Sequence, residues 1–160
     1  MQNKSFESSF PKSDIGLWVW LFPITYLIHL GEEYFGGEGF AAWINRVAGA
    51  NFSVRDFLVL NAIGLMFMSV GVVLLRKNSW RWLLVGLSGV VAINGLLHFF
   101  GSLLTRSYSP GLISGVLCWL PLGLATLFCQ WKVMARKSFF TGIAFAFGLH
   151  AIVSLLALWA

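Results

Sequence analysis

The stretch Tyr26-Leu27-Ile28-His29-Leu30-Gly31-Glu32-Glu33-Tyr34 places an imidazole and two carboxylates near the end of a long apolar run. On a helix, His29 lies three residues before Glu32 and four before Glu33, so the three side chains share one face. An ionised side chain at mid-bilayer costs about 2.5–3.5 kcal/mol even on lenient insertion scales. The stretch therefore predicts a functional site within a membrane-spanning helix.

The composition of the whole chain is also that of a membrane protein. Of the 160 residues, 58% are hydrophobic and 11% are charged, whereas a soluble domain carries about 25% charged residues. We expect one all-α domain over residues 1–160, a polytopic membrane protein with a bundle of five transmembrane helices and one short interfacial helix. The expected spans are about 15–34, 54–75, 80–105, 110–131 and 138–159, and the interfacial helix is expected at about 40–50.

Local signals predict how several of these helices begin or bend. Ser53 is a suitable N-cap, with Asp56 three residues later as its partner. The run from Ser107 to Gly111 predicts a tight turn, and Pro121 predicts a kink in the fourth span. Trp43 is expected at the level of the lipid headgroups.

The positions of the basic residues predict the orientation. The net charge of +5 does not indicate a nucleic-acid partner, because Lys and Arg lie at the ends of the apolar runs. One side of the expected bundle carries more of them than the other, which predicts a cytoplasmic N-terminus and an outside C-terminus in a cytoplasmic-type membrane. The richer side has Lys4, Lys12, Arg76, Lys77, Arg81, Lys132, Arg136 and Lys137, and the other side has Arg46, Arg55 and Arg106.

All three histidines of the chain are expected at one depth. A helix rises about 1.5 Å per residue, which places His29, His98 and His150 roughly 20–25 Å above the cytoplasmic ends of their spans, in the outer half of the bilayer. Other candidate residues fall at or near this layer, and they are Asn61, Asn94, Ser102 and Trp119. Beyond them lie Arg106 and Tyr108, whose hydroxyl is expected to bond to a site group or to Arg106.

These residues also have structural interpretations. The two asparagines are as well suited to hydrogen bonds between helices as to a site. His150 on an apolar face is compatible with a core histidine whose hydrogen bonds are all made, and Trp119 is compatible with packing between helices. Two adjacent carboxylates in hydrocarbon require a cation, a metal or a donor, so packing alone does not explain Glu32 and Glu33.

The run His29-Leu-Gly-Glu32-Glu33 resembles the HXXEE family of integral membrane proteins, which is named for this motif. The family pattern also contains a further histidine and a Tyr-x-Pro-Gly element, which here resemble His98 and the Tyr108–Gly111 segment. The resemblance covers about residues 20–125. It implies a helical membrane fold and a site, but no reaction.

A more distant similarity concerns sterol isomerases of the emopamil-binding type. These are small five-helix membrane proteins with a His-x-x-x-Glu pair, as in His29 and Glu33, and with a tryptophan that could face a carbocation. Only the local pair and the expected helix count are similar.

Three functions are compatible with these residues. The first is a metal-dependent membrane enzyme acting on a lipid-like substrate, with zinc or iron held by His29, His98 and His150 and with Glu32 or Glu33 as ligand or general base. In that case Asn61 or Asn94 is expected to bond the other ring nitrogen of a ligand histidine. The second is metal-free proton transfer on a sterol-like or isoprenoid-like molecule, with Glu33 as the acid. The third is a lipid-binding or cation-binding membrane protein, or a subunit of a complex, without enzymatic activity.

Overall fold

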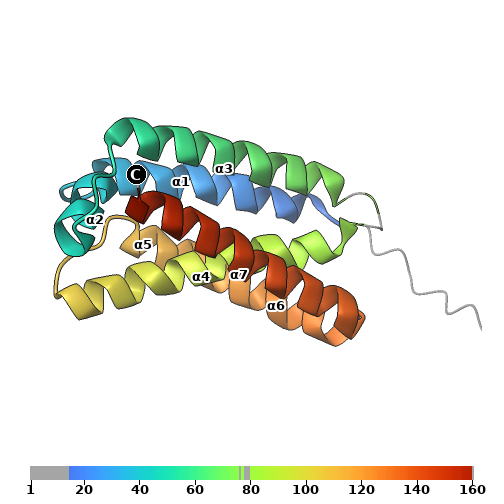
Figure 1. Ribbon diagram of the computed structural model, residues 1–160. Helices are drawn as coiled ribbons and strands as arrows, with labels where there is room; N and C mark the ends of the chain where they lie inside the picture. Colours follow the sequence, from blue (N-terminus) through green and yellow to red (C-terminus); the bar gives the residue numbers. More distant parts are fainter. Residues whose placement is uncertain (1–14, 76, 78–79, 160) are drawn as a thin grey trace, which may run out of the picture.

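The computed structural model describes residues 15–75, 77 and 80–159, and the regular structure in this part of the chain is entirely helical (Figure 1). The all-α prediction is therefore confirmed. Lys4, Lys12 and Arg76, which contribute to the predicted orientation, lie outside the described residues. The helices in chain order are η1 (Leu17–Trp20), α1 (Leu21–Phe35), α2 (Phe40–Ala48), α3 (Val54–Leu74), α4 (Trp82–Thr105), α5 (Leu112–Ser114), η3 (Gly115–Trp119), α6 (Leu120–Val133) and α7 (Arg136–Trp159).

Four helical segments of the described chain are long and apolar enough to cross a membrane, which indicates an integral membrane protein. They are α3, α4, the continuous segment Leu112–Val133, and α7. The expected first span differs, because α1 has 15 residues and is preceded by the short 3₁₀ turn η1. The structure thus supports four of the five expected spans by length and composition.

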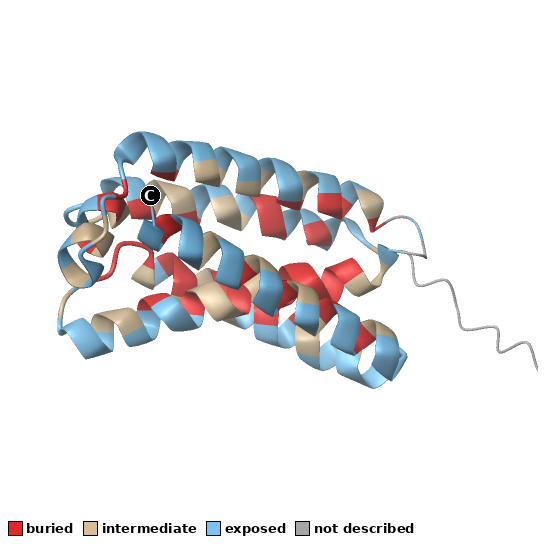
Figure 2. Cartoon of the chain, in the orientation of Figure 1, coloured by how far each residue is buried: buried red, intermediate tan, exposed pale blue. Residues whose placement is uncertain are grey.

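Helix α4 is the centre of the bundle. In its most apolar stretch 61% of the residues are buried, compared with 17–28% in the other three long segments (Figure 2). Small residues bring its neighbours close. A Cβ atom at Gly89 of α4 would lie 2.6 Å from the Cβ of Ala146 in α7, and one at Gly123 of α6 would lie 2.6 Å from the Ser88 carbonyl. Close helix contacts of this kind are typical of membrane proteins.

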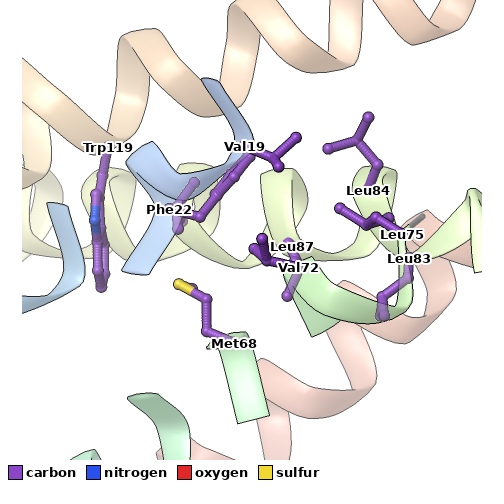
Figure 3. Close-up of a cluster of buried hydrophobic side chains, with 10 residues drawn as sticks. Val19, Phe22, Met68, Val72, Leu75, Leu83, Leu84, Leu87 and Trp119 are labelled. Atoms are coloured by element: carbon purple, nitrogen blue, oxygen red, sulfur yellow. The ribbon is translucent and has the colours of Figure 1, made fainter. Parts of the chain in front are cut away.

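An apolar core joins η1, α1, α3, α4 and η3. Phe22, Met68 and Leu87 are at most 3% exposed in this cluster, and Trp119 lies at one side of it (Figure 3). Burial of each such large side chain contributes about 1.5–3 kcal/mol. Trp119 also contacts His29 of the candidate site described below, so this core supports that site directly.

The segment between α1 and α3 folds back onto the bundle. Ser53 caps α3 in a capping box with Asp56, as predicted. Trp43 of α2 is only 6% exposed, and its Nε1 donates to Ser107 Oγ at 3.2 Å. The indole packs against α4, where Gly101 has no side chain, and the level of Trp43 at the lipid headgroups stays a prediction.

The chain widens into a π-helical turn, η3, just before Pro121. Pro121 is the second residue of α6 and cannot donate to the carbonyl four residues earlier. Near the position of the predicted kink the structure has a π-helical turn over Gly115–Trp119, and the helix continues through it into α6. Such turns are frequent at functional sites, and this one ends at Trp119, whose indole stacks on His29.

Candidate functional site

His29 and Glu33 from α1 and His98 from α4 form a buried cluster. Their exposed fractions are 1%, 5% and 4%, respectively. The Oε1 atom of Glu33 lies 3.5 Å from His29 Nε2 and 3.2 Å from His98 Nε2. The two imidazole rings meet edge to face with their centroids 4.9 Å apart. The prediction that His29 and His98 meet inside the bundle is therefore confirmed.

Serine hydroxyls hold the opposite nitrogens of both rings. His29 Nδ1 lies 2.8 Å from Ser114 Oγ, and His98 Nδ1 lies 2.9 Å from Ser109 Oγ. A hydroxyl both donates and accepts, so each serine can pair with either tautomer of its imidazole. His29 Nε2 is buried without a hydrogen-bond partner among the described residues.

Glu32 lies outside this cluster and anchors the segment that follows α4. Its Oε1 accepts from the Tyr108 hydroxyl at 2.6 Å and from the Ile113 amide at 2.8 Å, and its Oε2 accepts from the Ser114 amide at 2.6 Å. The predicted hydrogen bond between Tyr108 and a site group is thus confirmed. Burial and then the Glu32 carboxylate raise the pKa of Tyr108 to about 12.

The Tyr-x-Pro-Gly element shapes the cluster from one side. Ser102 Oγ accepts from the Ser109 amide at 2.8 Å, which fixes the serine that holds His98. Gly111 has φ +99°, and a Cβ atom there would lie 2.8 Å from Cε1 of both His29 and His98. Only glycine fits this position without displacing the rings.

The cluster has the ligand types and spacing of a metal site. Three ligand atoms, one from each of its residues, lie within 4.8 Å of one another. A tetrahedral zinc ion with bonds of about 2.0–2.2 Å separates its ligands by roughly 3.3–3.6 Å. The two distances from Glu33 Oε1, 3.2 and 3.5 Å, agree with that spacing. A cation would also satisfy the orphaned His29 Nε2. The group can therefore hold a metal ion.

The cluster lies in the wall of a cavity of about 550 Å³. Trp119 stacks on His29 with a centroid distance of 3.8 Å and donates from Nε1 to Thr25 Oγ. Asn61 accepts from the Tyr26 hydroxyl at 2.9 Å. Four of the predicted residues line this cavity without belonging to the group of three, and they are Asn61, Asn94, Trp119 and His150.

Four of the predicted site residues do not line the cavity, and they are Glu32, Ser102, Arg106 and Tyr108. Glu32 and Ser102 hydrogen-bond the segment after α4, as described above. Arg106 is exposed at the end of α4, where its φ is +50°. The ring nitrogens are held by Ser109 and Ser114 rather than by Asn61 or Asn94. Ser109 lies within the Tyr-x-Pro-Gly element, so this motif could have indicated it as a site residue. No motif in the sequence indicated Ser114 as a site residue.

Fold and site together define an all-helical, membrane-type protein with a buried His–Glu–His cluster. Residues 20–126 match the family described as "Protein of unknown function with HXXEE motif". The chain belongs to this HXXEE family, as its motif predicted. No curated protein and no solved structure matches the chain, and the similarity to emopamil-binding proteins has no support.

Proposed function

We propose that this protein is a membrane metalloenzyme in which His29, Glu33 and His98 hold one divalent metal ion, zinc or iron, beside a lipid-accessible cavity. The observation that carries the proposal is the convergence of three buried ligand atoms on one point, with His29 Nε2 otherwise unpartnered. Two imidazoles and one carboxylate suit both zinc and non-haem iron.

The number of ligands favours catalysis over a structural role. Structural zinc sites are closed by four protein ligands, whereas catalytic sites use three and leave a position open. The cluster supplies three ligands next to a cavity. A metal bound there would act as a Lewis acid and activate water. The serines orient the imidazoles, and Trp119 restrains the ring of His29.

The substrate class follows from the surroundings of the cluster. The cavity wall is almost entirely apolar, and the protein carries four membrane-type helical segments. A small lipid-like molecule that enters from the bilayer is the substrate that such a wall stabilises.

We also propose that η1 and α1 together form a fifth span. The four 3₁₀ residues and fifteen α-helical residues extend over roughly 30 Å, which equals the thickness of the hydrocarbon core of a bilayer.

With the N-terminus cytoplasmic, α2 and the cluster would lie toward the outer side. Single cysteines introduced at Glu38 and Ser107 should react with a membrane-impermeant reagent from outside intact cells. Labelling only after permeabilisation would refute this orientation.

The experiment for the metal is elemental analysis of the full chain purified in detergent after expression with zinc or iron. We expect about one ion per chain in the wild type and a loss of most metal in Glu33→Gln and His98→Gln. Glu38→Gln is the matched control, because Glu38 lies in the exposed loop and pairs with Arg46. Helical content by circular dichroism shows that each variant is folded. A folded wild type that takes up no zinc or iron, or full metal content in Glu33→Gln, would refute the proposal.

A second candidate is metal-free proton transfer on a lipid-like molecule. It is favoured by the His98–Glu33 distance of 3.2 Å, which suits a direct hydrogen bond. Turnover of a lipid extract by metal-free protein, unchanged by a chelator, would support this candidate over the first. No turnover in either state would favour a binding protein.

A further inference from the structure

The long helices α3 and α7 both line the cavity beside the cluster. Ile63 and Phe67 of α3 and Ile152 and Leu156 of α7 line the cavity and are also 50–57% exposed. Leu97 of α4 and Leu158 of α7 also line it and are 49% and 44% exposed. Exposed lining residues mark the mouth of a cavity, and most of these belong to α3 and α7. Because all six are apolar and belong to membrane-type helices, the mouth faces lipid rather than water.

Two polar side chains in the cavity wall have no hydrogen-bond partner among the described residues. Asn94 lines the cavity and its Oδ1 is buried and unsatisfied. His150 also lines it and is 9% exposed. Gly89 of α4 packs against Ala146 of α7. Asn94 lies five residues after Gly89 on α4, and His150 lies four residues after Ala146 on α7. The two polar residues therefore lie at a similar level along the two helices. A buried polar atom without a partner is costly, which makes Asn94 Oδ1 a candidate for a ligand contact. His150 contributes a second polar group to the same cavity wall.

The charge of the cavity wall restricts the ligand's polar group. Among the described residues that line it there is no lysine or arginine, and the single carboxylate is that of Glu33. A phosphate or carboxylate headgroup would therefore lack a counter-charge and face a like charge. A hydroxyl is neutral and both donates and accepts, so it matches an amide and a neutral imidazole together.

We propose that the cavity binds a neutral lipid alcohol, with its hydroxyl between Asn94 and His150 and its apolar body toward the mouth between α3 and α7. A volume of about 550 Å³ lies within the roughly 300–1,000 Å³ of pockets that hold drug-sized molecules. The ligand is therefore a single-chain or compact ring lipid. This inference names the ligand class of the proposed enzyme and depends on the cavity rather than on the metal.

The test is photolabelling of the full chain in detergent with a photoreactive long-chain primary alcohol. Competitors are the unlabelled alcohol, its methyl ether, the fatty acid and the amine of the same chain. We expect saturable labelling on α3 or α7, with the methyl ether and the acid competing at least about tenfold more weakly than the alcohol. Equal competition by all four compounds would overturn the proposal, because it would indicate only non-specific apolar binding. Preferred binding of the acid or amine would equally overturn it.

Substitutions test whether Asn94 and His150, the polar pair, contribute to alcohol binding beyond the apolar wall of the cavity. Asn94→Leu and His150→Leu should each weaken alcohol binding at least about tenfold, and His150→Gln, which keeps a donor and an acceptor, should restore much of it. Asn51→Leu is the matched control, because Asn51 is exposed in the loop before α3. Wild-type affinity in both leucine variants would refute the role of the pair.

Metal content measured on the same samples keeps the two proposals distinguishable. A metal-loaded wild type that binds no alcohol refutes the ligand class and leaves the metal centre standing. Alcohol binding by a chain that takes up no metal supports the ligand class and refutes the metal centre.

Discussion

Gly111→Ala is the most direct test of how the cluster is assembled. The new methyl group would lie 2.8 Å from the Cε1 atoms of both His29 and His98 and 3.0 Å from His98 Nε2. Real Cβ atoms do not approach neighbours so closely, so the rings or the turn must move. A left-handed conformation costs a non-glycine residue about 1–2 kcal/mol, and overpacking costs about 1–3 kcal/mol. Together they predict a loss of about 2–5 kcal/mol in the free energy of unfolding.

The assay is denaturant unfolding in detergent, followed by tryptophan fluorescence, together with metal analysis of the folded protein. Gly31→Ala is the matched control, because Gly31 lies inside α1 and a Cβ there meets nothing within 4 Å. That variant should gain up to about 1 kcal/mol from helix propensity. The reasoning is refuted if Gly111→Ala unfolds within about 0.5 kcal/mol of the wild type and binds metal equally well.

Two further substitutions and one titration test the groups around the cluster. Ser114→Ala removes the hydrogen-bond partner of His29 Nδ1 and should weaken metal affinity by about 10–100-fold in a competition titration. Ser69→Ala, which removes only a bond within α3, should not weaken it. Glu32→Gln should lower the free energy of unfolding by about 1–3 kcal/mol, because it weakens the hydrogen bonds to the segment after α4. The variant should still bind metal at saturating zinc. Metal loss like that of Glu33→Gln would show that Glu32 is a ligand. In an ultraviolet titration the phenol of Tyr108 should ionise near pH 12 rather than 10. Because this pKa is raised on folding, the stabilisation is present below about pH 10 and lost as the pH rises toward 12, and Glu32→Gln should shift the pKa back toward 10.

Local spacing predicted part of the site correctly. His29 and Glu33 are one helical turn apart, so their common face follows from helix geometry alone. The level of His98 follows from counting residues along an apolar helix. The length of α1 was less predictable, because the chain enters it through a 3₁₀ turn that composition does not distinguish from α-helix.

The different roles of Glu32 and Glu33 could not be obtained from spacing. Adjacent residues on a helix point about 100° apart, and both carboxylates lie within reach of the His29 face. The rotation of α1 about its axis decides which of them meets α4, and packing against the rest of the bundle sets that rotation. In the structure Glu33 turns toward His98, while Glu32 turns toward the amides of Ile113 and Ser114.

The sequence by itself determined an all-helical, apolar chain with a polar cluster at one level of its helices. These properties depend on composition and on contacts within one helical turn, which the order of residues specifies directly. Only the tertiary structure decided that Ser109 and Ser114 hold the imidazoles, that His150 lines the cavity outside the group of three, and that α3 and α7 both contribute to the cavity wall. Those features depend on how helices distant in sequence are rotated and packed against one another, and side-chain shape across the whole bundle sets that arrangement.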